Sequence, residues 1–332
     1  MADKRYDVVG IGNAIVDIIA RCDEGFITKH DLAKGSMRLI DADEANRLYA
    51  AMGPAVERSG GSVANAISGL ASFGAKCGFI GRVAADQFGG IFRHDIRSLG
   101  VAYDTSPAVD GAPTARCLIL VTPDGERTMN TFLGASVDFR PEDLDLGLIE
   151  AAKIVYLEGY LFDRDAAKSA FREAARAAKH AGAKVALTLS DAFCVDRHRD
   201  DFRALVRDGA DIVFANEMEI SSLYRVNSFQ EAADAALQDC EMAVLTRSEA
   251  GSVIVAQGET IEIEADPARV VDLTGAGDLY SAGFLYGLTQ GAPLAACGRL
   301  GSLAAAEAIS HIGARPEVSL RKLAKQNGLI PD

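Results

Sequence analysis

Short β-rich apolar runs recur along this chain, most of them separated by helix-like segments, and this alternation limits the fold more than any other feature. The runs lie at residues 8–11, 78–80, 154–157, 185–189, 212–214 and 243–245. Apolar residues spaced three and four apart predict helices that include 63–73, 87–99, 165–181, 217–224 and 293–312. The pattern predicts an α/β fold with a doubly wound, mostly parallel sheet in three layers.

Two further β-type runs, at 115–121 and 127–132, flank Pro123-Asp124-Gly125, a strong turn signal for an antiparallel hairpin. Together with 37–40 they predict a small separate sheet. A few strands are not stable alone, so we expect this sheet to cover a cleft at the C-terminal edge of the main sheet. No long linker interrupts the chain. We therefore expect a single domain over 1–332, with lid strands inserted from about 12–42 and 101–137.

Composition excludes several classes of partner. The 332 residues include 34 basic and 47 acidic side chains, and the net charge of −13 argues against nucleic acid and anionic membranes as partners. Six scattered cysteines form no CxxC pair, which is typical of free thiols in a reducing cytosol, and no apolar run reaches membrane length. We expect a cytoplasmic protein with a small-molecule substrate. Because an exposed lid edge can pair with a second copy, both a monomer and a homodimer remain open.

The segment Asp272-Leu273-Thr274-Gly275-Ala276-Gly277-Asp278 lies just before an apolar helix expected at 279–288. Glycines at a helix N-terminus leave N–H donors bare beside the positive end of the helix dipole, so a phosphate is stabilised there. Asp278 has two interpretations on this motif alone. It either favours the helix dipole or accepts a proton from an attacking hydroxyl.

Two other strand ends carry polar groups suited to an acceptor with hydroxyls. Gly12-Asn13 followed by Asp17 is either a strand-end turn or a site where a carboxylate accepts hydrogen bonds from vicinal hydroxyls. Gly60-Gly61 lets a ligand approach the backbone closely, and Asn65 on the following helix can both donate and accept. A Gly-Gly turn before a helix is also a common structural feature.

Two loops are candidates for nucleotide contacts. Asn216 and Glu219 share one face of a starting helix, where they form either an ordinary cap or a holder of Mg²⁺ through water. Thr246, Ser248 and Gly251 follow the next strand, as nucleotide contacts or as a polar hairpin turn. The chain has no Walker motif and no protein-kinase signature set, which excludes those modes of phosphate binding.

In combination, these motifs resemble the ribokinase family, also called PfkB-type carbohydrate kinases, over about residues 6–320. The match is carried by Gly60-Gly61 with Asn65, by the run 74–89, by Asn216 with Glu219, and by 272–278. The resemblance implies an ATP-dependent kinase that transfers the γ-phosphoryl to a primary hydroxyl.

The resemblance also implies roles for individual residues. Asp278 is the expected base, and Gly275, Ala276 and Gly277 form the anion hole. The expected acceptor site comprises Asn13, Asp17, Gly60, Gly61, Asn65 and Asp278. The expected ATP site comprises Asn216, Glu219, Thr246, Ser248, Gly251, Gly275 and Gly277. Glu219 would hold Mg²⁺ through water, and Asp272 with Thr274 would bind a monovalent cation such as K⁺. Ser248 replaces a glycine usual in the family, and Leu273 replaces a threonine.

The opening 12–18 resembles the Gly-Asn-x-x-x-Asp-Ile start of adenosine kinases, especially bacterial ones, so we expect the 5'-hydroxyl of adenosine or a related nucleoside as acceptor. The alternatives are a sugar or sugar-acid kinase with a fructose-, ribose- or ketodeoxygluconate-like acceptor, and a non-catalytic nucleoside- or nucleotide-binding regulator. Arg127 is either a phosphate-facing residue or an exposed turn residue. Three aromatic side chains either stack on a base or belong to the core: Phe132, Phe139 and Phe162. Met37 or Leu39 is a candidate for the lining of an apolar pocket.

Overall fold

An eight-stranded sheet forms the centre of the protein in a computed structural model that describes residues 4–256 and 258–331. In spatial order its strands are β13 (Glu259–Ile263), β12 (Ser252–Ala256), β11 (Met242–Thr246), β10 (Ile212–Asn216), β9 (Lys184–Thr188), β8 (Ala152–Glu158), β1 (Tyr6–Ile11) and β5 (Cys77–Ile80). The strands from β11 to β5 are parallel, and β12 and β13 add an antiparallel edge. The predicted doubly wound, mostly parallel sheet is confirmed. Residues 1–3, 257 and 332 of the expected domain lie outside the described residues.

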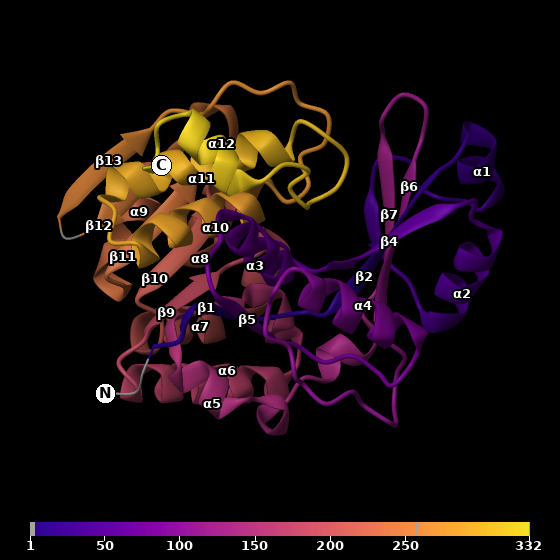
Figure 1. Cartoon of the computed structure of the whole chain (residues 1–332), viewed down its shortest axis with the longest axis horizontal. Coiled ribbons are helices and arrows are strands. Elements are labelled where there is room, and N and C mark those ends of the chain that lie inside the picture. The colour runs from indigo at the N-terminus through magenta and orange to yellow at the C-terminus, as the bar shows by residue number, and fades with distance from the viewer. Residues whose placement is uncertain (1–3, 257, 332) are drawn as a thin grey trace.

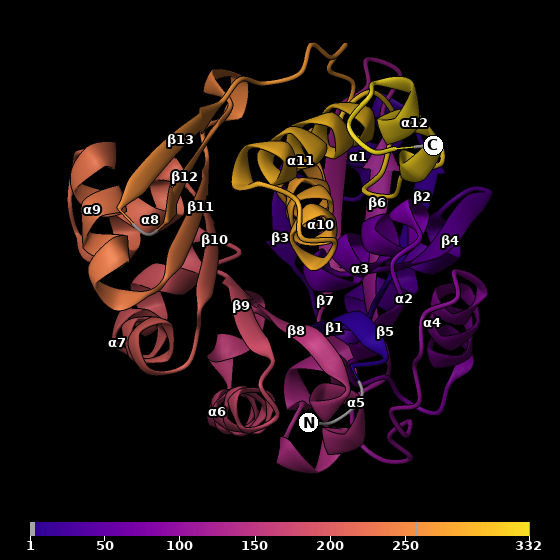
Figure 2. The same cartoon turned by 60° about the vertical axis from the view of Figure 1, so that its left-hand side comes forward.

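Helices cover both faces of this sheet and make three layers, which Figure 2 shows edge-on. Along β10, Ile212 and Phe214 point into one core, whereas Val213 and Ala215 point into the other, because side chains alternate along a strand. The first core contains side chains from α3 (Ser62–Phe73), α10 (Ala276–Thr289), α11 (Leu294–Ala308) and α12 (Leu320–Gln326). The second contains side chains from α5 (Leu146–Glu150), α6 (Asp165–His180), α7 (Ala192–Asp208), α8 (Glu217–Tyr224) and α9 (Phe229–Asp239).

A second, five-stranded sheet stands beside the main body (Figure 1). Its strands in order are β3 (Met37–Leu39), β7 (Arg127–Phe132), β6 (Ala115–Val121), β2 (Ile15–Arg21) and β4 (Ala55–Gly60). The predicted hairpin is the antiparallel pair β6 and β7. Strands β2 and β3 lie within the segment 12–42 that is expected to supply strands. Strand β4 lies outside both expected segments and has no run of β-branched residues. Three helices accompany this sheet: α1 (Glu24–Lys29), α2 (Ala42–Ala51) and α4 (Gln87–Ser98).

Two helix boundaries differ from the sequence prediction. The helix expected at 279–288 already begins at Ala276, immediately after the glycine turn. The helix expected at 293–312 ends at Ala308, because the carbonyl of Ile309 accepts hydrogen bonds from the N–H groups of Val271 (2.8 Å) and Asp272 (3.2 Å). This contact holds the turn at 272–278 against the end of α11. Within the described residues, no helix combines the length and apolar character needed to cross a membrane.

The strand order reverses at β1, which lies between β5 and β8. In doubly wound sheets the connections diverge at such a point and leave a crevice at the carboxyl ends of the strands. Asn13 follows β1 and Glu158 ends β8, and their side chains meet there in a hydrogen bond of 2.7 Å. A binding crevice is therefore expected at the carboxyl ends of these two strands.

Candidate active site

The N-terminus of α10 is built to accept an anion. The preceding Gly275 adopts φ +78°, a conformation that favours glycine, and no side chain caps the helix. Aspartates accept hydrogen bonds from the first turns of α1, α2, α4, α5 and α7, whereas α3, α6 and α11 lack a side-chain cap as α10 does. The first N–H groups of a helix have no partner within it. The N–H of Ala276 donates to the Leu273 carbonyl (3.3 Å), which leaves the N–H of Gly277 as the group of this turn that a ligand can reach. A Cβ added at Gly277 would meet nothing within 4 Å, which leaves room for that ligand.

Asp278 lies in the first turn of α10, but its side chain turns away from the helix toward α3. The carboxylate accepts hydrogen bonds from Ser62 Oγ (2.7 Å) and Asn65 Nδ2 (3.0 Å). Burial raises the pKa of Asp278 to about 6, while these two hydrogen bonds oppose the shift. A half-buried carboxylate with this pKa can exchange a proton near neutral pH, so the geometry favours the chemical interpretation over simple dipole stabilisation.

Glu158 organises the crevice, and sequence reasoning missed it. Its Oε2 accepts from the Val63 N–H at the start of α3 (2.9 Å), and its Oε1 accepts from Asn13 Nδ2. Burial raises the pKa of Glu158 to about 7. A Cβ at Gly12 would run into this carboxylate, which explains the glycine. Since Glu158 ends an apolar strand, only its charge in an otherwise buried run could have marked it.

Two amide oxygens at this crevice have no hydrogen-bond partner in the part of the chain that the structure describes. They are Oδ1 of Asn13 and Oδ1 of Asn65, on side chains that are 2% and 5% exposed. Buried polar atoms are normally paired, because leaving one unpaired costs about 1–3 kcal/mol. Two free acceptors beside Asp278 fit a ligand that brings hydroxyl donors.

Asp17 and the two glycines of the first motif lie in the same place. A Cβ at Gly60 would overlap the Asp17 carboxylate, and one at Gly61 would overlap the Asn13 carbonyl. Burial raises the pKa of Asp17 to about 6, Arg315 and Arg127 lower it, and Asp278 raises it further. The structure thus brings together all six residues of the expected acceptor site: Asn13, Asp17, Gly60, Gly61, Asn65 and Asp278.

Two arginines complete the charge balance of the site. Arg315 is 9% exposed and donates to the carbonyl and the hydroxyl of Ser59, and burial lowers its pKa to about 10. The sequence offered no signal for Arg315, which lies in an irregular segment after α11. Arg127 pairs with Asp272 as a buried ion pair without hydrogen-bond alignment, so it is not an exposed turn residue, and its phosphate-facing role stays a prediction.

The Asp272 carboxylate is already surrounded by donors. Its Oδ1 accepts from the Thr274 N–H (2.9 Å), and its Oδ2 accepts from the Gly313 N–H (2.7 Å) beside Arg127. A monovalent cation at Asp272 and Thr274 would share the carboxylate with this guanidinium. The cation site implied by the resemblance therefore stays a prediction.

Asn216 and Glu219 form a capping box at the start of α8. Asn216 Oδ1 accepts from the Glu219 N–H (2.9 Å), while Glu219 accepts from the Asn216 N–H (3.0 Å) and Nδ2 (2.6 Å). Burial raises the pKa of Glu219 to about 7, and the charges of Asp191 and Asp278 add to the shift. The two residues cap α8, and the Glu219 carboxylate is close enough to Asp278 for their charges to interact.

The loop with Thr246, Ser248 and Gly251 lies beside this capping box, because Thr246 pairs with Asn216 in the parallel register of β10 and β11. Ser248 adopts φ +50°, a left-handed conformation that glycine adopts without strain. Ser248 therefore adopts the backbone conformation that a glycine at this position would favour. Gly251 has φ +82°, and a Cβ there would overlap the Ile263 carbonyl.

The aromatic candidates belong to the cores rather than to the pocket. Phe139 is fully buried, and Phe162 stacks on Phe202 with ring centroids 4.1 Å apart. Phe132 packs against the first core, whereas the lining candidates Met37 and Leu39 are 52% and 61% exposed on β3.

Tyr160, which sequence reasoning missed, lies near Asp278. Burial raises its pKa, and the charges of Asp191, Asp278, Glu219 and Glu158 contribute to the shift. Tyr160 lies in the short turn that directly follows β8, at the carboxyl edge of the sheet. No sequence pattern distinguishes it from a core tyrosine.

Comparison with known proteins agrees with this geometry. Residues 34–320 match the model of the family described as pfkB family carbohydrate kinase, and the chain belongs to that family. A probable sugar kinase from Rhizobium etli is 51% identical, with a TM-score of 0.90, over 98% of this chain and 100% of that one. An adenosine kinase from Sinorhizobium meliloti is also 51% identical, with a TM-score of 0.89, over 97% and 99%. A 5-dehydro-2-deoxygluconokinase from Shouchella clausii is 25% identical over 92% of this chain and 90% of its own length.

The ribokinase-like fold is therefore established, and the chain is a sugar or nucleoside kinase, a phosphotransferase that acts on an alcohol group.

Proposed function

We propose that this kinase transfers the γ-phosphoryl of ATP to the 5'-hydroxyl of adenosine or a related nucleoside. The observation that carries the proposal is the Asp278 carboxylate, held at the uncapped N-terminus of α10 by Ser62 and Asn65. A base and an anion hole on one helical turn are what phosphoryl transfer to a hydroxyl requires, since positioning and charge stabilisation supply most of the catalysis.

In this proposal each group has one task. Asn13 Oδ1, Asn65 Oδ1 and Asp17 accept hydrogen bonds from the acceptor's hydroxyls, which orients the reacting oxygen toward Asp278. Asp278 takes the proton as the oxygen attacks. The N–H of Gly277, in the turn formed with Gly275 and Ala276, stabilises the charge that develops on the transferred group.

ATP would supply the phosphoryl group, and bound Mg²⁺ would offset charge on its phosphates. The residues proposed to line the nucleotide edge of the crevice are Asn216, Glu219, Thr246, Ser248 and Gly251, and Glu219 would hold the metal through water. The Glu219 carboxylate fits the role of metal holder, because it is close enough to Asp278 for their charges to interact.

A neutral acceptor fits the charges at the crevice better than an acidic one. Arg315 is hydrogen-bonded to Ser59, and Arg127 is paired with Asp272, so both guanidinium groups are already engaged. Asp17 and Asp278 would repel a carboxylate on the ligand. The opening 12–18 and the similarity to the S. meliloti adenosine kinase support a nucleoside.

The second candidate is a sugar or sugar-acid kinase. It is supported by the similarity to the R. etli protein and to the S. clausii 5-dehydro-2-deoxygluconokinase. A non-catalytic binder of nucleosides or nucleotides would have no use for the Asp278 carboxylate, so the same experiment separates all three.

The test is Mg²⁺-dependent ADP production from ATP with adenosine, other nucleosides, ribose, fructose and sugar acids as acceptors, with and without K⁺. We expect turnover with adenosine and its loss in Asp278→Asn. Preference for a free sugar or a sugar acid would overturn the nucleoside assignment and retain the kinase. Equal turnover by Asp278→Asn would overturn the proposed base.

A further inference from the structure

A groove of roughly 580 Å³ lies between α6 and α7, on the face of the main sheet opposite α3 and α10. Its walls come from the exposed side of α6 and from the second half of α7. The groove is therefore separate from the Asp278 site, which lies at the carboxyl edge of the sheet. Its volume is within the range of small-molecule sites.

One wall of the groove is cationic. Lys168, Arg172, Arg176 and Lys179 recur along α6 at spacings of four, four and three, so they share one face of the helix. Such a concentration of positive charge is unusual in a chain whose net charge is −13. It would draw in an anion rather than repel it.

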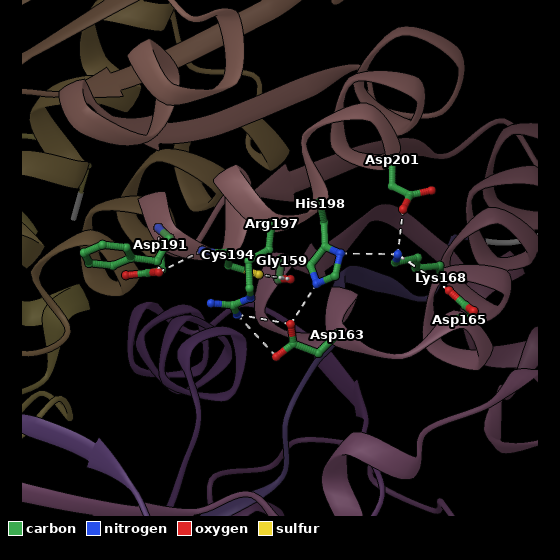
Figure 3. A network of polar contacts seen from close by, with 10 residues as sticks. Gly159, Asp163, Asp165, Lys168, Asp191, Cys194, Arg197, His198 and Asp201 are labelled. Atoms are coloured by element: carbon green, nitrogen blue, oxygen red, sulfur yellow. Dashed lines mark hydrogen bonds and ion pairs between the residues drawn. The ribbon is translucent and has the colours of Figure 1, made fainter.

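The two end cations of this stripe are already engaged. Lys168 donates to Asp201 (2.6 Å) and contacts His198 Nδ1 (3.4 Å), whose other ring nitrogen contacts Asp163 (2.8 Å), as Figure 3 shows. Lys179 lies 3.6 Å from Asp211. These pairs hold the ends of the stripe in place and satisfy their charges.

The two central arginines have no such partner. Arg172 donates to Ser169 Oγ (3.3 Å), and Arg176 donates to the Arg172 carbonyl (3.2 Å). Within the described residues, neither guanidinium has a carboxylate at ion-pairing distance. The two acidic side chains on the opposite wall are also engaged, since Asp201 accepts from Lys168 and Asp208 accepts from Arg207 (3.0 Å). Arg172 and Arg176 are thus the free anion-binding groups of the groove.

The floor between these arginines and α7 is apolar. Ala175 and Leu205 are 3% and 5% exposed, and Ala204 is half-buried beside them. Of these three, Ala204 has side-chain surface that a ligand can reach. A ligand that carries a ring or another apolar body beside its anionic group would pack against this surface.

We propose that this groove binds a small phosphate ester. The phosphate lies between the guanidinium groups of Arg172 and Arg176, whose planar forks match phosphate oxygens, and the organic part packs against Ala204. Nucleoside monophosphates and sugar phosphates share this chemistry. The net charge of the chain and the size of the groove disfavour a polyanion such as nucleic acid.

Calorimetric titration of the whole protein tests the proposal, with AMP, glucose 6-phosphate and inorganic phosphate as probes. The variants are Arg172→Gln with Arg176→Gln, and Ala204→Glu, which places a carboxylate opposite the arginines. Arg299→Gln, an exposed arginine on α11, is the matched control. All changed side chains are exposed or half-buried, and thermal unfolding verifies each fold.

We expect at least one ester to bind the wild type at a site beyond the catalytic one, with affinity lowered about tenfold or more in both groove variants and unchanged in Arg299→Gln. AMP binding alone would identify nucleotides as the source, and glucose 6-phosphate binding alone would identify sugars. Absence of a second site, equal affinity in the groove variants, or equal binding of inorganic phosphate and esters would overturn the proposal. Because binding is measured without turnover, its failure is separate from failure of the proposed function.

Discussion

At the scale of single residues, the site depends on carboxylates held in a partly apolar crevice. Asp278, Asp17, Glu158 and Glu219 all have pKa values raised by burial, to about 6 or 7. A cluster of this kind costs stability when charged, and proteins tolerate it where the charge performs a function. The cluster is therefore itself an indication of the active site.

The first prediction concerns the pH dependence of turnover. Asp278 acts as a base only when deprotonated, so we expect kcat/KM to fall as pH decreases through about 6. The measurement is the pH profile of kcat/KM between pH 5 and 8.5, with solvent viscosity varied to show that chemistry is observed. A profile that stays flat down to pH 5 would remove Asp278 from the role of base.

A second prediction follows from the same shift through linkage. The folded-state pKa of Asp278 lies above the usual 3.8, so its contribution to stability is present below about pH 4 and lost as pH rises through about 6. Asp278→Asn removes the buried charge and should melt at a higher temperature than the wild type at pH 8, with the difference closing at pH 4 to 5. A lower melting temperature at pH 8 would mean that Ser62 and Asn65 compensate the charge fully.

At the scale of elements, the two glycines of the turn before α10 have different roles. Gly275 serves the backbone, because its φ is +78° and a Cβ would lie 2.6 Å from Ala314 Cβ. Gly277 serves the ligand, because a Cβ there meets open space. The two glycines of this motif are thus needed for different physical reasons.

This division predicts opposite outcomes for two matched substitutions. Gly277→Ala should fold with unchanged or slightly higher stability but lose phosphoryl transfer by roughly tenfold or more, since the methyl occupies the anion cradle. Gly275→Ala should lose about 1 kcal/mol or more of stability. Urea unfolding and steady-state kinetics on both variants check this. Normal turnover in a stable Gly277→Ala protein would place the phosphate elsewhere.

The sequence predicted the elements that carry a clear period or motif. The parallel strands, the β6–β7 hairpin and the residues of both glycine motifs were within reach, because apolar runs and Gly-Gly or Gly-x-Gly turns have local signatures. Strand β4 was not, since Ala55–Gly60 is stabilised by pairing with β2 rather than by its own composition.

The partners of the motif residues were also out of reach. Glu158 and Arg315 enter the site through contacts made by distant segments, such as Glu158 with Asn13 and Arg315 with Ser59. For Asn216 and Glu219 the sequence identifies the residues, but the same pair can serve as a helix cap or as a metal-binding group. Sequence spacing identifies such a pair and leaves its use open.

At the scale of the whole molecule, one buried ion pair joins the second sheet to the main body. Arg127 begins β7, and Asp272 begins the turn that leads to the anion hole. The expected lid therefore contacts the turn that would bind the phosphoryl group. We propose that this pair holds the sheet over the crevice and keeps water from the reacting phosphate.

The prediction is that Arg127→Gln raises ATP hydrolysis relative to transfer, because the sheet no longer closes firmly. Breaking a buried pair by removing one partner typically costs about 3–5 kcal/mol, so faster amide exchange in β6 and β7 is also expected. Arg21→Gln is the control, since Arg21 is an exposed arginine at the end of β2 in the same sheet. An unchanged ratio of hydrolysis to transfer would show that the pair has no part in closure.

The order of strands in space also sets the order in which this protein can be made. Strand β1 pairs with β8 through Tyr6 and Ala152, and β2 pairs with β6 through Ile15 and Ala115. During translation, β1 and β2 can pair early on one edge, with β5 and β4. Their other hydrogen-bonding edges stay uncovered until β8 and β6 leave the ribosome. Nascent chains of this kinase should therefore depend on chaperones until nearly half of the polypeptide has been synthesised.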